Sequence, residues 1–316
     1  MDNNAGNAFP AALLRSWRDL QEARTRIEHG GNARPFGWIQ RIEVNDDRWT
    51  AGLQRIHMSR CNLMIGGIGA GKSCLLSLLT GLSHPHELMS RVAVHHNISA
   101  QIVWFDPQPR EACLRVSKGD LAYQVDGTRT PFAARPYRSI VVRDRHHMGE
   151  GSLVDIAATL KVDPWCVTAA LPRLGSRLGG RVSEARHEDG AVFVRMWNSD
   201  RLTRWGRHLS GGDRDCFYYE LAIAIADLQA EVEPTLLVFD SAFSGTAPDV
   251  GRHVLQVMSA PARAFQTVVL DDIRAVTSMT DDDLDGWSLT MIDRRDQGSE
   301  LRQFGIAQGL SSNSSI

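Results

Sequence analysis

The segment of this sequence with the clearest chemistry is a glycine-rich loop followed by a lysine and a serine. Residues 66–73, Gly-Gly-Ile-Gly-Ala-Gly-Lys-Ser, match the pattern G-x-x-x-x-G-K-[ST]. The glycines let backbone N–H groups converge on phosphate oxygens, and a helix after the loop directs its positive dipole end at the same anion. We expect Lys72 to contact the terminal phosphates of a nucleotide and the Ser73 hydroxyl to bind Mg²⁺. The predicted nucleotide-binding residues are Gly66, Gly67, Gly69, Ala70, Gly71, Lys72, Ser73 and Cys74.

Two further segments predict binding chemistry. In Leu209-Ser210-Gly211-Gly212-Asp213, a serine and two glycines open a predicted helix over 213–230. Unpaired N–H groups at a helix start and a nearby hydroxyl face one point, which favours a second anion site. The apolar run 236–239 ends in Asp240, which predicts a buried strand that presents a Mg²⁺ ligand at the carboxyl edge of a parallel sheet.

In this order, the three segments resemble the Walker A loop, the L-S-G-G-x signature and the Walker B strand of the ABC-type ATPases. Two predicted strands before residue 62 and the arginines 201, 204 and 207 ahead of the signature are similar to the chromosome-maintenance and recombination-repair branch, the SMC- and RecF-like heads. The long coiled-coil arms of the chromosome-maintenance proteins have no counterpart in this sequence. The resemblance implies an α/β P-loop fold, with a mainly parallel sheet, helices on both faces and an α/β insertion between Walker A and signature.

The resemblance also implies cofactors and partners. In this family two heads enclose two ATP molecules, and the signature of one head covers the terminal phosphate on the phosphate loop of the other. Ser210, Gly211 and Gly212 would then act on the nucleotide of a second copy, with ATP and Mg²⁺ as cofactors. Asp213 stands where the family more often has glutamine or glutamate, and an acid is favourable in a first helical turn.

The residues that drive hydrolysis in this family depart from its pattern. Ser241 follows Asp240 where the family has a glutamate, and a hydroxyl lacks useful basicity near pH 7. The position of the D-loop aspartate reads Ala247, with Asp249 two residues further on. Since phosphoryl transfer rests mainly on positioning and charge neutralisation, we expect ATP to be bound and hydrolysed slowly.

The switch histidine of the family is also replaced. The run 267–270 is followed by Asp271 and Asp272, and Asp272, or Asp271, occupies the histidine position. An acid at this position is a candidate for orienting the attacking water. The predicted catalytic residues are Lys72, Asp240, Asp271 and Asp272.

Other candidates rest on weaker patterns. Gln108 follows a predicted strand at 102–105 and matches the position at which the family has a Mg²⁺-binding glutamine; Gln101, before the strand, is its rival. Trp38 and Trp49 could stack on adenine, but core packing is the better interpretation of each. Histidine pairs without matched cysteines or carboxylates are better interpreted as surface or core residues than as metal ligands.

The elements that must position these residues follow from the spacing of apolar residues. We expect an N-terminal helical extension over 1–36, a first half of the ATPase core over 37–120, an arginine-rich insertion over 121–189, a second half of the core over 190–308 and a disordered tail over 309–316. The predicted strands and helices nearest the motifs are 62–65, 73–82, 213–230, 235–239, 249–258, 267–270 and 289–292. Prolines and glycines between 110 and 208 predict mainly irregular structure there, apart from a strand expected over 191–197.

Composition excludes several classes of protein. The chain has 316 residues, 43% of them apolar and 23% charged, which excludes a mainly disordered protein. Its apolar runs are shorter than the roughly 20 residues that a membrane span needs. Five scattered cysteines and a start without the basic and apolar regions of a secretory signal predict a cytoplasmic protein without disulfides.

The net charge of −2 gives no general affinity for nucleic acid, but residues 121–208 hold 14 Lys and Arg against 9 Asp and Glu. A hypothesis of DNA binding through this segment rests on its charge, above all on Arg135, Arg138, Arg143 and Arg145. The resemblance implies a head that dimerises or oligomerises around Mg·ATP. Formation of this ATP-bound assembly would be coupled to DNA or to a second protein, in a DNA repair or bacterial defence role. The alternative is a catalytically inactive scaffold locked by its nucleotide.

Overall fold

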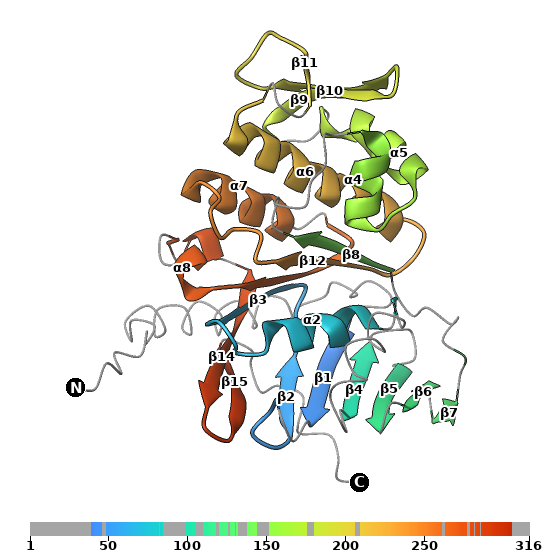
Figure 1. Ribbon diagram of the computed structural model, residues 1–316, viewed down its shortest axis with the longest axis vertical. Helices are drawn as coiled ribbons and strands as arrows, with labels where there is room; N and C mark the ends of the chain where they lie inside the picture. Colours follow the sequence, from blue (N-terminus) through green and yellow to red (C-terminus); the bar gives the residue numbers. More distant parts are fainter. Residues whose placement is uncertain are drawn as a thin grey trace, which may run out of the picture.

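The computed structural model (Figure 1) describes residues 39–45, 49–81, 83–84, 99–104, 110–117, 120–125, 127–129, 131, 138–143, 152–175, 180–205, 209–260, 263–276, 279–280, 282–284 and 286–304. The predicted N-terminal helical extension, the predicted tail and Gln108 lie outside these residues.

A six-stranded sheet forms the centre of the molecule, in the strand order β15-β14-β3-β13-β12-β8. All neighbours run parallel except β14 and β15, which form an antiparallel hairpin. The strands are β3 (Cys61–Gly66), β8 (Arg138–Arg143), β12 (Thr235–Asp240), β13 (Gln266–Asp271), β14 (Trp287–Arg295) and β15 (Gly298–Phe304). The sheet is therefore mainly parallel, as the sequence predicted.

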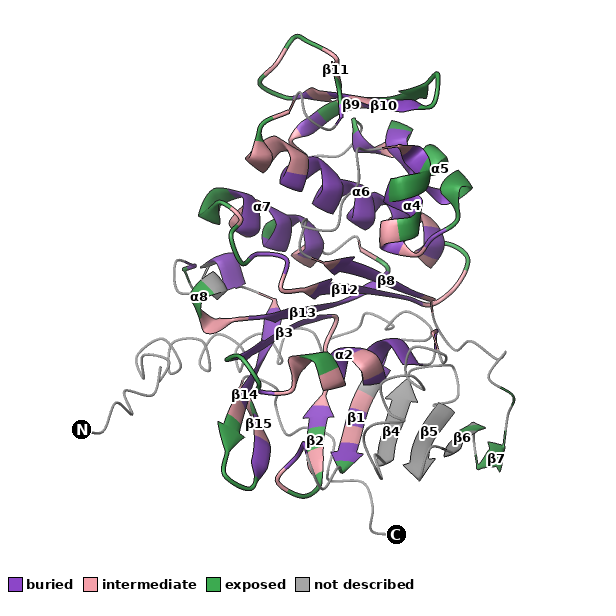
Figure 2. Ribbon diagram, in the orientation of Figure 1, coloured by how far each residue is buried: buried purple, intermediate pink, exposed green. Residues whose placement is uncertain are grey.

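Helices cover both faces of this sheet because its strands are apolar on both sides. Alternate residues of β12 enter two separate cores: Leu237 and Phe239 pack towards α6 (Gly211–Ala230), and Leu236 and Val238 pack towards α2 (Lys72–Gly81). Figure 2 shows the buried residues gathered on both sides of the central strands. Helix α7 (Pro248–Ser259) joins α6 on its side of the sheet.

A second six-stranded sheet is antiparallel and lies on the far side of α2 (Figure 1). Its strand order is β2-β1-β4-β5-β6-β7. The strands are β1 (Ile39–Asn45), β2 (Gln54–His57), β4 (Ser99–Trp104), β5 (Arg110–Ser117), β6 (Asp120–Val125) and β7 (Thr128–Arg129). The core between the two sheets contains α2, so the helix that follows the phosphate loop packs against one sheet on each side.

The remaining elements form a smaller unit beside α6, and two short helices lie near the central sheet. An antiparallel sheet, in the order β11-β10-β9, packs with two helices against α6. These elements are α4 (Leu153–Leu160), α5 (Pro164–Leu174), β9 (Val182–Glu188), β10 (Ala191–Met196) and β11 (Thr203–Arg204); α8 (Ile273–Val276) and the 3₁₀ turn η2 (Asp282–Leu284) lie between β13 and β14. None of the described helices combines the length and apolar character that crossing a bilayer requires.

The strand expected over 191–197 is confirmed as β10, but the prediction of irregular structure for the rest of 110–208 is wrong. This stretch forms strands β5 to β11 and two helices, and its strand β8 belongs to the central sheet. Prolines misled the prediction: Pro164 occupies the first turn of α5, where its missing N–H costs nothing, and Pro172 lies inside the same helix. The predicted boundary between 189 and 190 falls in the turn that joins β9 to β10.

Candidate functional site

The phosphate loop connects β3 to α2, as the motif requires. β3 is fully buried and ends at Gly66, and α2 begins at Lys72. Gly69 and Gly71 have φ angles of +76° and +99°, which residues with a Cβ rarely adopt. The Lys72 ammonium donates hydrogen bonds to the carbonyl oxygens of Gly66 and of Gly67, the latter at 3.0 Å. The loop thus closes around the lysine amine, and the hydroxyl-bearing Ser73 lies exposed beside it.

Two side chains from outside the loop support it. Trp49 Nε1 and the Ser299 hydroxyl both donate to the Ala70 carbonyl, at 3.4 Å and 2.7 Å. The Trp49 ring lies against Gly71, where an added Cβ would come within 1.7 Å of Nε1. Trp49 is 4% exposed, so the interpretation of this tryptophan as a core residue is confirmed. The loop is therefore held by a buried ring and not only by its own glycines.

Three of the predicted acids lie at the carboxyl edge of the central sheet, next to this loop. Asp240 ends β12 and Asp271 ends β13, with Asp272 directly after it. In the strand register, Asp271 is opposite Ile65, the residue before Gly66. Ligands of parallel α/β sheets bind at this edge. The tertiary structure thus brings the phosphate loop and the three acids together.

Asp240 is partly exposed and faces an arginine of the neighbouring strand. Its Oδ2 lies 3.7 Å from Arg143 Nε, an ion-pair contact that is too long for a hydrogen bond. The next residue, Ser241, has φ +54° and donates its N–H to the Leu270 carbonyl at 2.8 Å. The chain therefore turns sharply where the family has a glutamate, and the Ser241 backbone is bonded to β13.

Asp271 is completely buried and organises the loop that follows β12. Its carboxylate accepts hydrogen bonds from Phe243 N at 3.0 Å, the Ser244 hydroxyl at 2.8 Å and Asp272 N at 2.8 Å. Burial raises the pKa of Asp271, although these hydrogen bonds and the charge of Lys72 oppose the rise. With three donors bound, this carboxylate holds the loop in place and has little capacity left for a water.

Asp272 is the more accessible member of the pair, with 18% of its side chain exposed. Its Oδ1 accepts from the backbone N and from Nε of Arg274, both at 3.1 Å. Burial tends to raise the pKa of Asp272, but the hydrogen bonds and charge of Arg274, together with the charge of Lys72, lower it overall. Asp272 is therefore a charged carboxylate within the electrostatic reach of the phosphate-loop lysine.

The signature forms the exposed start of helix α6. Ser210 is the N-cap: its hydroxyl accepts from Asp213 N at 3.1 Å and donates to the Asp213 carboxylate at 2.7 Å. Ser210 is exposed, and Gly211 and Gly212 are partly exposed, so the chain's own core does not cover this helix start. The reciprocal bonds explain the unusual Asp213, which fixes the serine hydroxyl at the mouth of the helix.

Sequence reasoning missed a buried acid that joins the signature helix to its neighbours. Glu220 of α6 is fully buried and accepts from His253 of α7 at 2.8 Å and from Arg181 N at 2.7 Å. Cys216 donates to the same carboxylate oxygen at 3.4 Å. The ligand atoms of Cys216, Glu220 and His253 lie within 4.8 Å of one another and are of types that bind zinc. Hydrogen bonds already satisfy the Glu220 carboxylate, however. The sequence signal that could have revealed this buried acid is that Glu220 stands alone within an apolar run of the predicted helix.

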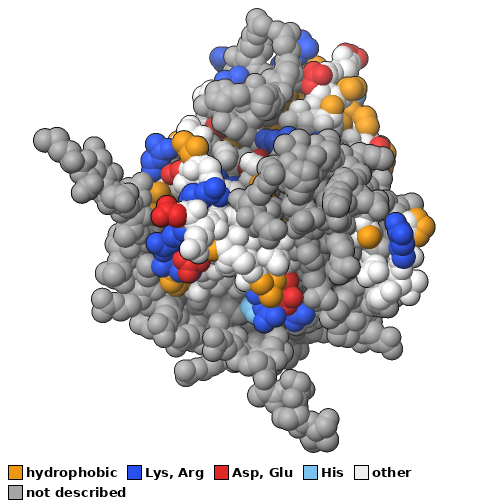
Figure 3. All heavy atoms as spheres, turned by 60° about the horizontal axis from the view of Figure 1, so that its bottom comes forward, with side chains coloured by type: hydrophobic (Ala, Val, Ile, Leu, Met, Phe, Trp, Pro, Cys, Tyr) orange, Lys and Arg blue, Asp and Glu red, His pale blue; other side chains and the backbone are white. Residues whose placement is uncertain are grey.

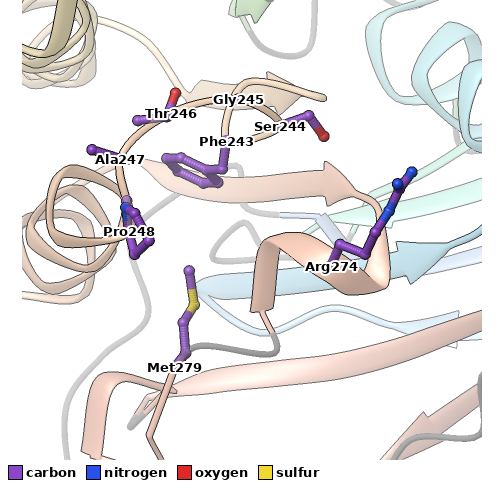
Figure 4. A pocket seen from close by; sticks show the side chains of 9 residues that line it. Phe243, Ser244, Gly245, Thr246, Ala247, Pro248, Arg274 and Met279 are labelled. Carbon is purple, nitrogen blue, oxygen red and sulfur yellow. The ribbon is translucent and has the colours of Figure 1, made fainter.

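A pocket of about 370 Å³ lies beside the loop that follows β12 (Figure 4). Phe243 and Met279 face its interior, and Arg274 extends away from them. Residues 243–248, Gly251, Arg274 and Met279 line it, and none of the predicted nucleotide-binding residues is among them. The pocket is therefore not formed by the phosphate loop, although its Ser244 and Arg274 are hydrogen-bonded to Asp271 and Asp272.

Of the four arginines named for DNA binding, the two that the structure describes lie beside acids. Arg138 contacts Glu233 at 2.8 Å, and Arg143 contacts Asp240. Arg135 and Arg145 lie outside the described residues, as does Gln108, and Gln101 lies on β4 in the antiparallel sheet. On the face shown in Figure 3, the described Lys and Arg side chains are scattered in small groups, several of them next to Asp and Glu, and form no broad basic surface.

Comparison with solved structures shows which known proteins share this fold. No family model and no curated protein sequence matches the chain. Among solved structures, an SMC head bound to the C-terminal winged-helix domain of ScpA shares 14% identity, with 84% of this chain and 98% of that one covered and a TM-score of 0.62. The SMC head domain from Thermotoga maritima shares 12% identity over 85% of this chain and 100% of its own, with a TM-score of 0.60.

The recombination mediator protein RecF of the RecFOR pathway, solved as RecF-ATPrS, is similar as well. It shares 12% identity over 85% of this chain and 98% of its own, with a TM-score of 0.56. At this level of identity, the likeness concerns the fold. The chain therefore has the P-loop fold of the SMC and RecF heads, as its motifs and their order predicted.

Proposed function

We propose that this protein is an ATPase head that binds Mg·ATP and closes with a second copy of itself around the nucleotide. The observation that carries the proposal is the joint geometry of the phosphate loop, Asp240 and the exposed signature. The first two lie at one sheet edge, and the third is an unburied helix start that can meet a nucleotide on another copy. Each is a site for an anion or a cation, and together they suit a magnesium-bound nucleotide.

Within this function the described residues divide the work. Backbone N–H groups of the loop and Lys72 hold the phosphates, Ser73 and Asp240 hold Mg²⁺, and Ser210, Gly211 and Gly212 bind the nucleotide of the second copy. The bound ion supplies charge neutralisation at the transferred phosphoryl group. The role proposed for Gln108 as a further ligand rests on the motif alone.

We further propose that hydrolysis is slow. Ser241 cannot accept a proton at neutral pH, and its backbone is turned and bonded to β13. Of the two candidate acids for orienting water, Asp272 suits the task better than Asp271, because its carboxylate is charged and partly exposed. Asp271 serves as the residue that positions the loop 241–247.

The closed state would act on a partner. An SMC head of the same fold has been solved bound to a ScpA domain, which favours a second protein as the receiver of the signal. A role in DNA repair or bacterial defence is consistent with this fold. Direct DNA binding is less supported, since Arg138 is bonded to Glu233 at 2.8 Å and Arg143 lies beside Asp240 at the edge of the central sheet.

The test measures ATP binding, association and phosphate release in parallel. Wild type should bind Mg·ATP and increase in mass on light scattering with ATP but not with ADP. Lys72→Ala should lose most of the ATP affinity, since it removes a charged phosphate contact worth about 1.5–3 kcal/mol. A melting temperature that ATP leaves unchanged in the wild type would refute the proposal.

Ser241 also favours a second candidate function, a scaffold locked by a structural ATP. The same measurements separate the two. ATP-driven association without phosphate release identifies the scaffold. Release that is slow, and absent in Asp272→Asn and in Lys72→Ala, identifies the ATPase.

A further inference from the structure

Strand β8 ends in an arginine beside the proposed Mg²⁺ ligand. Arg143 is opposite Asp240 in the parallel register, just as Val141 is opposite Val238. Both valines pack into the core on the α2 side of the sheet. Because side chains alternate along a strand, Asp240 and Arg143 also project from that face, on the side where Lys72 begins α2.

The guanidinium of Arg143 is attracted to Asp240 without being locked to it. The 3.7 Å contact is longer than a hydrogen bond, and Nε is buried with no hydrogen-bond partner among the described residues. The side chain is 38% exposed, so the group can turn towards the solvent side of the sheet edge. Arginine always carries its charge, and its planar fork of donors matches the oxygens of a phosphate.

The sheet places this fork at the border of the phosphate site. Two strand spacings, about 10 Å, separate β8 from β13. Asp271, at the end of β13, is opposite Ile65, the residue before the phosphate loop, so the loop begins directly beside the end of β13.

We propose that Arg143 binds the terminal phosphate of ATP and makes this site prefer ATP to ADP, an inference that rests on the proposed function. Asp240 exchanges its loose contact with Arg143 for Mg²⁺, and the released guanidinium turns to the phosphate. Before the nucleotide arrives, the positive charge of Arg143 faces the carboxylate of Asp240. ADP lacks the terminal phosphate and gains nothing from this contact.

The experiment compares ATP and ADP affinities, each with Mg²⁺, by calorimetric titration of the full chain. Arg143→Ala should weaken ATP binding by roughly tenfold or more, which corresponds to one charge-assisted hydrogen bond, and change ADP binding less than about twofold. Arg143→Lys keeps the charge without the fork and should fall between these values. Arg138→Ala is the matched control, because it removes an arginine from the other end of β8 that pairs with Glu233; its ATP-to-ADP ratio should equal that of the wild type.

Each alternative result has a distinct meaning. An unchanged ATP-to-ADP ratio in both Arg143 variants would overturn the inference alone. Equal weakening of both nucleotides together with weaker Mg²⁺ binding would also overturn it, since Arg143 would then only orient Asp240. Failure of the wild type to bind ATP would overturn the proposed function as well. Melting temperatures without nucleotide show whether the variants are folded, and Arg143→Lys serves as the test if Arg143→Ala is not.

Discussion

Gly71 is the last glycine of the phosphate loop, and the packing of Trp49 against it leads to a quantitative prediction. A methyl group at Gly71 would lie 1.7 Å from Trp49 Nε1, 2.4 Å from Cδ1 and 2.7 Å from Cε2. All three distances are far below van der Waals contact, so either the indole or the loop must move. The indole is buried and its N–H is bonded to Ala70, so it has little room to retreat.

The substitution Gly71→Ala carries two separate costs. The φ angle of +99° at position 71 is strained for any residue with a Cβ, and this strain costs about 1–2 kcal/mol. Forcing extra volume against a packed ring adds about 1–3 kcal/mol. We therefore expect Gly71→Ala to lower the free energy of unfolding by about 3 kcal/mol.

Gly69→Ala is the matched control in the same loop. Gly69 also has a positive φ, +76°, but no atom lies within 4 Å of the position of an added Cβ. This variant should lose only the strain, about 1–2 kcal/mol. Urea unfolding followed by circular dichroism measures both variants. Equal losses in the two would show that Trp49 does not pack on the loop and would refute the support assigned to it.

Two further predictions concern the signature and the thiols. Ser210→Ala should lower stability by about 1 kcal/mol and abolish ATP-dependent association, whereas Ser152→Ala, which removes the equivalent N-cap of α4, should cost the same and leave association intact. Urea titration measures the loss of stability, and light scattering measures the association. Association that survives in Ser210→Ala would contradict the role of the signature. Under native conditions iodoacetamide should label Cys74 before Cys216, because Cys74 is partly exposed whereas burial raises the pKa of the Cys216 thiol. ATP should slow labelling at Cys74, and peptide mass spectrometry that finds Cys216 labelled equally fast would contradict the packing of α6.

The amino-acid sequence determined the parts of the site whose conformation depends on near neighbours. The run of glycines before Lys72 predicts a phosphate loop because positive φ angles are a local property of glycine. The flanking strand and helix, the strand before Asp240 and the start of α6 follow from short apolar runs and from a serine at a helix start. The order of these motifs was sufficient to predict the fold that the solved SMC and RecF structures share.

The strands between 110 and 143 illustrate what local reasoning missed. β5, β6 and β8 are short and of mixed polarity, and prolines interrupt the segment that contains them. A strand of this kind is stable only through its partners, and β8 finds its partner in β12, far along the chain. The spacing of apolar residues within the segment gives no indication of its pairing with β12.

Only the tertiary structure decided which residues surround the phosphate loop. Trp49 lies on Gly71, and Arg143 lies beside Asp240. Asp271 accepts two hydrogen bonds from the loop after β12 and one from its neighbour Asp272. Parallel pairing of four strands brings Arg143, Asp240 and Asp271 to the sheet edge at which the phosphate loop begins. Such contacts depend on strand order and register, whose energies come from packing across the whole sheet, and no local pattern of residue types contains that information.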